Sequence, residues 1–198
     1  MRDSRMAALY HYCMAALILT SGYIGRAVAQ EVHTHVASSQ PAVANADKAS
    51  ALLNIVRNAT ERFKDVKVAE AEGYALQFGC VSGPDSGAMG LHYINGQILS
   101  SGIIDPARPP IVIYEPVPGG GLRLIGADFL VFADAWNASH SGPPELMGQL
   151  FQFFESPNRF QLPAFYTLHV WAWKENPNGA FVNWHPHVKC QAFSGQNP

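Results

Sequence analysis

The stretch FYTLHVWAWKENPNGAFVNWHPHVKC, from Phe165 to Cys190, holds three of the four tryptophans, three of the eight histidines and one of the three cysteines. Aromatic and imidazole rings alternate along a predicted strand, Phe165–Lys174, which is followed by a turn at Asn176–Gly179. Such rings are costly to leave in water, yet each histidine has nitrogens that need partners. The segment is therefore either the wall of a core or the wall of a ligand or metal pocket.

Side chains on a strand alternate between its two faces. The two faces here are Phe165, Thr167, His169, Trp171 and Trp173 on one side, and Tyr166, Leu168, Val170 and Ala172 on the other. Both are apolar enough to be covered by other parts of the chain. We therefore expect Leu168 and Val170 to lie in the core and His169 to face a polar pocket on the opposite side.

A long helix is predicted to open the domain. Apolar residues recur at steps of three and four from Ala51 to Phe63, and Asn45 or Asp47 is available as an N-cap. Lys67–Glu72 either extends this helix or forms a second short one that Gly73 ends. A further helix is predicted over Pro143–Glu155, with an apolar face made of Leu146, Met147, Leu150, Phe153 and Phe154.

Short β-rich runs, separated by proline and glycine, make up most of the remainder. They are Tyr74–Val81, Leu91–Ile94, Ile111–Tyr114, Leu122–Phe132 and Phe165–Lys174, with a closing strand near Phe181. Consecutive strands without intervening helices favour antiparallel pairing. The expected fold is α+β: a long N-terminal helix packed on a mainly antiparallel sheet, which can be curled or barrel-like, with one further helix.

The first 29 residues have the features of a signal peptide. Arg2 and Arg5 precede a mostly apolar run, Met6–Ile24, and Ala27-Val28-Ala29 offers a small-x-small cleavage site. The alternative is an uncleaved N-terminal anchor. We expect a signal peptide (1–29), a flexible lead-in (30–45) and a single α+β domain (46–198), exported to the periplasm or the extracellular space. After cleavage no stable membrane insertion is expected.

Composition and charge restrict the class of partner. Hydrophobic residues make up 48% of the chain and charged residues 14%, which is typical of a globular domain. Removing residues 1–29 lowers Lys+Arg from 13 to 10 and Asp+Glu from 15 to 14, so the net charge changes from −2 to about −4. No basic run remains, which argues against nucleic acid or an anionic membrane surface as a partner. A small molecule or a metal ion is the expected ligand.

Cysteine usage is consistent with export. Because Cys13 lies in the leader, Cys80 and Cys190 are the two cysteines of the mature chain, and in an oxidising compartment they have one possible intramolecular pairing. The alternative is two buried free thiols.

Three polar residues within apolar strands form a candidate metal site. His92 lies in GLHYI, Glu115 ends IVIYE and His169 lies on the aromatic strand, while Asp128 interrupts the otherwise apolar IGADFLVF. Together His92, Glu115 and His169 would make a two-histidine, one-carboxylate set, which suits zinc, iron or copper. Their spacing matches no short metal motif, and the alternative is that each histidine bonds a neighbour inside the core. His185 and His187, in WHPHV, are secondary candidates for which a surface loop is the simpler interpretation.

Three classes of function follow. A metal-dependent enzyme or metal-binding protein would use His92 and His169 as ligands and Glu115 as a ligand or general base. A non-catalytic binder of small apolar ligands would line its pocket with Phe165, Trp171, Trp173 and Trp184. An envelope structural or interaction protein would use the same aromatic residues only as core.

Four blocks carry a resemblance to other proteins: GCVSGPDSGAMGLHYIN (79–95), DPARPPIVIYEPVPGGGLRLIGADFLV (105–131), PPELMGQLF (143–151) and LHVWAWKENPNGAFVNWHPHVKC (168–190). With their MGxHY, LYEP-like and LHVWxWxxNPxGxF motifs, they resemble a widespread family of exported bacterial proteins that are labelled hypothetical or uncharacterised. The resemblance spans about Glu61 to Cys190. It implies export, one domain and a recurring set of His92, Glu115, His169, Cys80 and Cys190, but no reaction.

The chain departs from this family pattern at two places. Many members have histidine-tyrosine where this chain has Phe165-Tyr166, which weakens any metal site that needs a histidine at position 165. Members end near WNPxVxC, whereas this chain has His185 and His187. A role for either of these histidines would therefore be particular to this chain.

Overall fold

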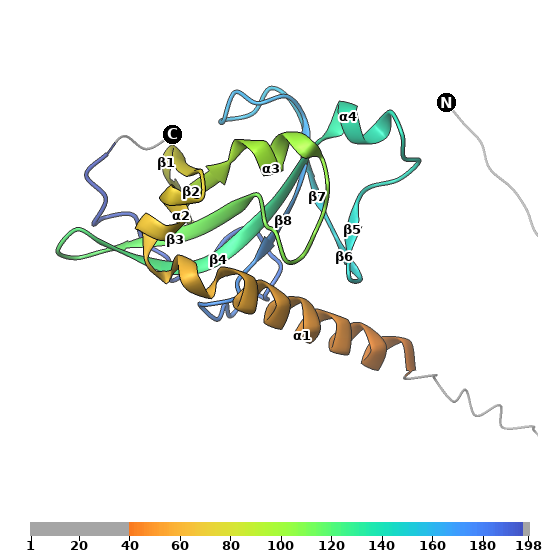
Figure 1. Ribbon diagram of the computed structural model, residues 1–198, viewed down its shortest axis with the longest axis horizontal. Helices are drawn as coiled ribbons and strands as arrows, with labels where there is room; N and C mark the ends of the chain where they lie inside the picture. Colours follow the sequence, from red (N-terminus) through yellow and green to blue (C-terminus); the bar gives the residue numbers. More distant parts are fainter. Residues whose placement is uncertain (1–39, 196–198) are drawn as a thin grey trace, which may run out of the picture. The chain divides into compact units, whose positions relative to one another are not determined.

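A six-stranded antiparallel sheet, curled into a half-barrel, forms the centre of the computed structural model, which describes residues 40–195 (Figure 1). Its strands follow the order β1-β2-β3-β4-β8-β7. Their bounds are β1 (Tyr74–Gly83), β2 (Gly87–Asn95), β3 (Ile111–Val117), β4 (Gly121–Phe132), β7 (Gln152–Phe154) and β8 (Phe165–Val170). The expected α+β fold with a mainly antiparallel sheet is confirmed. The predicted signal peptide lies outside the described residues.

The long helix α1 (Gln40–Thr60) packs on one face of the sheet. Leu52 and Val56 are fully buried against β4 and β8, where Phe129 and Leu168 belong to the same core cluster. The helix begins before the predicted domain boundary, so residues 40–45 of the expected lead-in are helical and Asn45 and Asp47 lie inside the helix. Alanines at 42, 44 and 46 favour a helix there, but this exposed turn has no apolar periodicity to reveal it.

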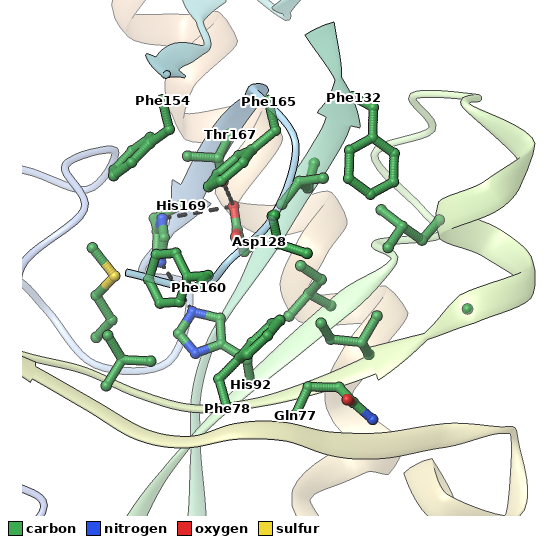
Figure 2. A pocket seen from close by; sticks show the side chains of 18 of the residues that line it. Gln77, Phe78, His92, Asp128, Phe132, Phe154, Phe160, Phe165, Thr167 and His169 are labelled. Carbon is green, nitrogen blue, oxygen red and sulfur yellow. Dashed lines mark hydrogen bonds and ion pairs between the residues drawn. The ribbon is translucent and has the colours of Figure 1, made fainter. Parts of the chain in front are cut away.

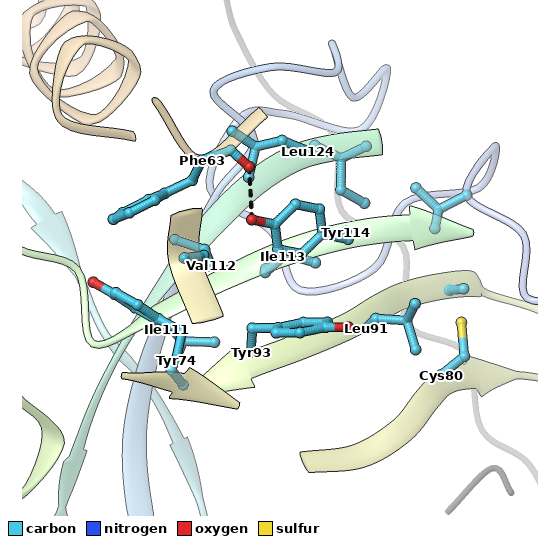
Figure 3. Close-up of a cluster of buried hydrophobic side chains, with 14 of the residues drawn as sticks. Phe63, Tyr74, Cys80, Leu91, Tyr93, Ile111, Val112, Ile113, Tyr114 and Leu124 are labelled. Atoms are coloured by element: carbon cyan, nitrogen blue, oxygen red, sulfur yellow. Dashed lines mark hydrogen bonds between the residues drawn. The ribbon is translucent and has the colours of Figure 1, made fainter. Parts of the chain in front are cut away.

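Four short helical segments connect the long helix and the strands. They are η1 (Glu61–Lys64), α2 (Val66–Ala71), α3 (Gly96–Ser101) and α4 (Ala133–Asn137). Helix α2 is the predicted second short helix, and Gly73 follows it with a φ of +89°. Figure 3 shows how η1 is fixed to the sheet: the hydroxyl of Tyr114 donates a 2.7 Å hydrogen bond to the carbonyl oxygen of Phe63.

The predicted helix over Pro143–Glu155 is wrong. This segment forms the two-residue strands β5 (Glu145–Leu146) and β6 (Gln149–Leu150), which pair with each other, followed by β7 at the sheet edge. Met147 and Gly148 have φ values of 50° and 83°, which no helix tolerates. Leu146 and Phe151 join the core under α1, whereas Leu150 is 61% exposed, so the residues do not share one buried face.

The aromatic strand is shorter than predicted and has no regular strand after it. β8 ends at Val170, and residues 171–195 continue as turns and loops. Their only backbone ladder contact within the described residues is an isolated bridge between Ala88 and His185. A disulfide joins Cys190 in this segment to Cys80 on β1, 110 residues earlier, and confirms the predicted pairing.

Glycines and bulges allow the sheet to curl. A side chain at Gly126 would place its Cβ 2.6 Å from the carbonyl oxygen of Val170, and one at Gly90, whose φ is +98°, would lie 2.6 Å from that of Tyr114. The β1–β2 ladder is also interrupted by a bulge at Phe78 and Gly79. Such features increase local twist and bend strands. The sheet face opposite α1 consequently encloses a pocket.

No helix within residues 40–195 has the length and hydrophobicity needed to cross a membrane.

Candidate metal centre in an apolar pocket

Two histidines from strands that are not neighbours meet in the pocket. The Nε2 atoms of His92 on β2 and His169 on β8 lie 3.4 Å apart, although β3 and β4 separate these strands. In a flat sheet the two strands would be about 14 Å apart, since neighbours are spaced by ~4.8 Å. The curl of the sheet therefore creates the contact, and it brings together the two histidines that the sequence singled out.

Asp128 is the carboxylate of the cluster (Figure 2). It lies on β4 as the direct cross-strand partner of His169, and its Oδ1 is 3.6 Å from Nδ1 of that histidine. The hydroxyl of Thr167 donates a 2.6 Å hydrogen bond to the same oxygen. One donor atom from each of His92, Asp128 and His169 lies within 4.8 Å of the others. The three residues are 7%, 3% and 2% exposed.

The second ring nitrogen of each histidine, Nδ1, also lies inside the protein. The Nδ1 atoms of His92 and His169 are buried and make only weak contacts within the described residues: hydrogen bonds with Asn183 and with the backbone of Gly90 raise the pKa of His169 and of His92, respectively, against the effect of burial. Most buried polar atoms have a partner, and leaving one without costs about 1–3 kcal/mol. The Nε2 atoms, which face each other, are the nitrogens that can bind a metal.

Burial also sets the protonation of the cluster. It lowers the pKa of His92 to about 4, with a smaller contribution from His169, and it lowers the pKa of His169 to about 4. Burial raises the pKa of Asp128 to about 6, and the neighbouring His92 and the hydrogen bond from Thr167 limit this rise. At neutral pH both imidazoles are uncharged and the carboxylate is mostly ionised, which is the form in which these residues bind metals.

The separation of the two imidazoles fits a metal ion between them. Two zinc–nitrogen bonds of ~2.0–2.1 Å that meet at a tetrahedral angle place their nitrogens about 3.3–3.4 Å apart. The two Nε2 atoms of the cluster are 3.4 Å apart. Two histidines and one carboxylate leave coordination positions open, as in catalytic rather than structural sites.

Glu115 does not join the histidines, so the predicted set His92, Glu115 and His169 is wrong in its carboxylate. Glu115 is buried, but it lies beyond the pocket, where Lys174 donates to both of its carboxylate oxygens at 2.8 Å and Arg123 to one at 2.9 Å. The backbone N–H of Lys189 is a third donor, at 3.3 Å. Glu115 thus ties the end of β3 to the segment after β8.

The secondary candidates His185 and His187 are also outside the cluster. His185 is fully buried rather than in a surface loop: its Nε2 pairs with the carbonyl oxygen of Glu175 and its Nδ1 accepts from the backbone N–H of His187. His187 is exposed. With both of its nitrogens in use, His185 holds the 171–195 segment in place and is not free to bind a metal.

The cluster opens into a cavity of about 440 Å³ with mostly apolar walls. Its aromatic side chains are Phe78, Phe132, Phe154, Phe160 and Phe165 (Figure 2). The remaining large walls are aliphatic: Val81, Met89, Ile94, Leu99, Ile111, Leu130 and Leu162. A volume of this size is within the usual range for small-molecule sites. Phe165, which was among the residues proposed to line an apolar pocket, is part of this wall.

The three tryptophans expected beside Phe165 do not line the pocket. Trp173 points to the helices, where its Nε1 donates to Thr60 and Lys64 lies over its ring. Trp171 donates to the carbonyl oxygen of Val182 and contacts the ring of His185. Trp184 packs on Gly83 of β1. The strand alternation that predicted two of them as pocket residues does not apply, because β8 ends at Val170.

The sequence pattern indicated that Asp128 has a special role, but it gave little indication that Phe78 and Phe160 line the pocket. Asp128 interrupts an apolar strand, and its register opposite His169 follows once β4 and β8 are paired. Phe78 lines the pocket because a bulge places it at a φ of 64°, and Phe160 belongs to an irregular loop. Neither conformation has a periodicity that a sequence pattern can show.

No protein-family model, curated protein or solved structure matches this chain.

Proposed function

We propose that this chain is an exported, single-domain protein that binds one divalent first-row metal ion through His92, Asp128 and His169. Zinc, iron and copper are the candidate ions. The observation that carries the proposal is the 3.4 Å separation of two buried imidazole nitrogens beside a buried carboxylate. The burial of all three side chains beside an apolar cavity supports it.

The metal would supply Lewis acidity and open coordination positions inside an apolar cavity, which suits either a metal-dependent enzyme or a metal-binding protein. The residues of the chain have separate tasks. His92 and His169 present Nε2 donors, Asp128 provides the negative charge, and Thr167 fixes the Asp128 carboxylate. The apolar walls and the burial of the three side chains lower the local dielectric constant, which strengthens electrostatic interactions within the site.

The disulfide supports the proposal of export. Disulfides persist in oxidising compartments and are rare in the cytosol of most organisms. Intact-mass measurement of the protein recovered from periplasm or medium tests this. A mature chain that begins at Gln30 is expected, and recovery of the whole chain from the cytosol would contradict it.

Metal uptake is the central test. The purified protein is dialysed against a chelator and then titrated with Zn²⁺, Fe²⁺ or Cu²⁺, and bound metal is measured by elemental mass spectrometry. We expect one equivalent per chain for the wild type. Removal of a ligand in His92→Ala, Asp128→Ala or His169→Ala should weaken binding strongly.

The exposed His187 provides the matched control. His187→Ala removes an imidazole outside the cluster and should keep full uptake. Cobalt absorption spectra add a readout of geometry, since Co²⁺ in a tetrahedral site absorbs visible light strongly. No uptake by the wild type, or an equal loss in His187→Ala, would exclude the proposed site.

The shape of the cavity favours a second candidate, a metal-independent binder of a small apolar ligand. Twelve large apolar side chains line a cavity of about 440 Å³ around the cluster. Such a protein would bind a fluorescent apolar probe equally well before and after chelation. An envelope structural protein would bind neither the probe nor the metal.

A further inference from the structure

The polar groups of the pocket are unevenly distributed. Its lining residues with polar side chains are Gln77, His92, Asp128, Thr167 and His169. Gln77 is exposed, and the hydroxyl of Thr167 is occupied by Asp128. The described lining includes no lysine or arginine. A bound molecule therefore meets polar partners at the histidine–aspartate cluster and apolar walls elsewhere.

With a metal ion bound, the charges of His92, Asp128, His169 and the ion would not cancel. A divalent ion with two neutral imidazoles and one carboxylate leaves a net charge of about +1 in a buried position. An uncompensated buried charge is costly, and the described lining offers no second carboxylate to neutralise it. A hydroxide derived from water could balance this charge, but it could not fill the apolar cavity. A singly charged oxygen anion attached to an apolar body does both.

The cavity has walls of two kinds. Phenylalanine rings follow one another on one side, with centroids 5.5 Å apart for Phe78 and Phe160, 6.4 Å for Phe160 and Phe165, and 5.0 Å for Phe165 and Phe154. The sheet and α3 contribute aliphatic side chains, among them Leu130 and Leu99. Along the β4–β8 ladder, the next cross-strand pairs on the pocket side after Asp128–His169 are Leu130–Thr167 and then Phe132–Phe165. An apolar body can extend along this direction from a head at the metal.

We infer that the ligand or substrate of this pocket is an amphiphile with an apolar body and one anionic oxygen head, such as a carboxylate, and that the head binds the metal. This inference rests on the proposed metal site and specifies what that site holds. Phe154 and Phe160 are half-buried. Occupation of the cavity would cover the pocket-facing parts of their rings.

Binding of decanoate and of decan-1-ol, measured by calorimetry, tests the head and the body separately. The two probes share an alkyl chain and differ in charge. Decanoate should bind the zinc-loaded protein at least about tenfold more tightly than the chelated protein, the gain expected from one contact between charged groups. Decanol should bind both forms alike. In the cobalt-loaded protein, decanoate but not decanol should shift the visible absorption bands.

Variants that fill the cavity test the location. Leu130→Trp, and independently Leu99→Trp on α3, should abolish decanoate binding while zinc uptake is retained. Leu150→Trp is the matched control, because it makes the same change at a leucine that is 61% exposed and outside the pocket. It should bind decanoate as the wild type does.

The outcomes separate this inference from the proposed function. Normal zinc uptake with no decanoate binding, or with equal affinity before and after chelation, overturns the inference and leaves the metal site standing. Absence of zinc uptake overturns both. Loss of decanoate binding in Leu150→Trp as well would show that binding occurs outside this pocket, and would also overturn the inference.

Discussion

Asp128 and His169 are cross-strand partners in the β4–β8 ladder, so the backbone register itself holds the carboxylate beside the imidazole, with Oδ1 and Nδ1 3.6 Å apart. A histidine that binds a metal commonly has a carboxylate at its other ring nitrogen, which fixes the tautomer and the ring orientation. In the proposed site Asp128 would fix the orientation of His169 and supply negative charge beside the metal. Glu115 differs from it, because Lys174 and Arg123 pair with Glu115, whereas the pocket lining around Asp128 includes no lysine or arginine.

Asp128→Asn should abolish strong metal binding without unfolding the protein. Burial raises the pKa of Asp128, so its ionised form is unfavourable in the metal-free fold. A neutral amide of the same shape removes that penalty, and the metal-free variant should be at least as stable as the wild type at pH 7. Denaturant unfolding after chelation and elemental analysis after zinc loading measure the two effects. A marked loss of stability would mean that the ionised carboxylate has a structural role.

Glu115→Gln should give the opposite result. Glu115 accepts hydrogen bonds from Lys174 and Arg123 at the edge of the core, and the substitution removes its charge. Both cations can reach solvent, so we expect a destabilisation of about 1–3 kcal/mol rather than the larger cost of a fully buried pair. Zinc uptake should be unchanged. A loss of uptake comparable to that of Asp128→Asn would restore Glu115 to the site that the sequence suggested.

Adjacent residues on β8 should separate stability from binding. Leu168 is buried under α1, whereas His169 faces the pocket on the opposite side of the strand. Leu168→Ala should cost ~2–5 kcal/mol, as other large-to-small core substitutions do. His169→Ala should cost less, because its ring lines the pocket and not the core under α1, and it should lose metal uptake. Equal losses of stability in the two variants would indicate a plain core histidine.

The sequence predicted those parts of the fold that have a regular period. Leu168, His169 and Val170 were placed on their correct faces because strand alternation holds between Phe165 and Val170. The same rule failed for Trp171 and Trp173, because the strand has ended there. The segment Pro143–Glu155 has apolar spacing that fits a helix, but Met147 and Gly148 turn the chain after two residues of β5.

Only part of the site could be predicted, because strand periodicity shows which residues are unusual but not how distant strands meet. His92 and His169 stood out as polar residues in apolar strands, but their meeting depends on the curl of the sheet, which Gly90, Gly126 and the bulges allow. Glu115 and Asp128 were both carboxylates in apolar strands, and composition alone cannot choose between them. Pairing decides the choice: Asp128 is opposite His169, while Glu115 is opposite Arg123.

Reduction of the Cys80–Cys190 disulfide should lower stability substantially. The bond closes a loop over a sequence separation of 110 residues, which corresponds to on the order of 4–5 kcal/mol of denatured-state freedom. A large drop in Tm is expected with reductant, and the Cys80→Ala/Cys190→Ala variant should show the same drop without it. Alkylation of the unreduced, denatured protein should label neither cysteine of the pair. If both are labelled, the disulfide does not form in solution.

The metal-free protein should lose stability as the pH falls from about 6.5 to about 4. His92 and His169 have folded pKa values of about 4, below the ordinary value of 6.5, so the unfolded chain binds two more protons in this range. Asp128 acts in the opposite direction, because its folded pKa of about 6 exceeds 3.8 and the folded chain keeps one more proton. Burial also lowers the pKa of His185, which adds to the effect of the other histidines.

The balance is at least about one proton taken up on unfolding, so the free energy of unfolding should fall by roughly 1.4 kcal/mol for each pH unit in the middle of this range. Urea unfolding of chelated protein at pH 4.5, 5.5 and 6.5 measures the slope. His169→Phe removes one of the two buried imidazoles that take up a proton on unfolding. The slope should therefore be smaller by the contribution of about one proton, roughly 1.4 kcal/mol per pH unit. His187→Phe, at the exposed histidine, is the control and should keep the wild-type slope. An unchanged slope in His169→Phe would mean that His169 is not held uncharged by the fold.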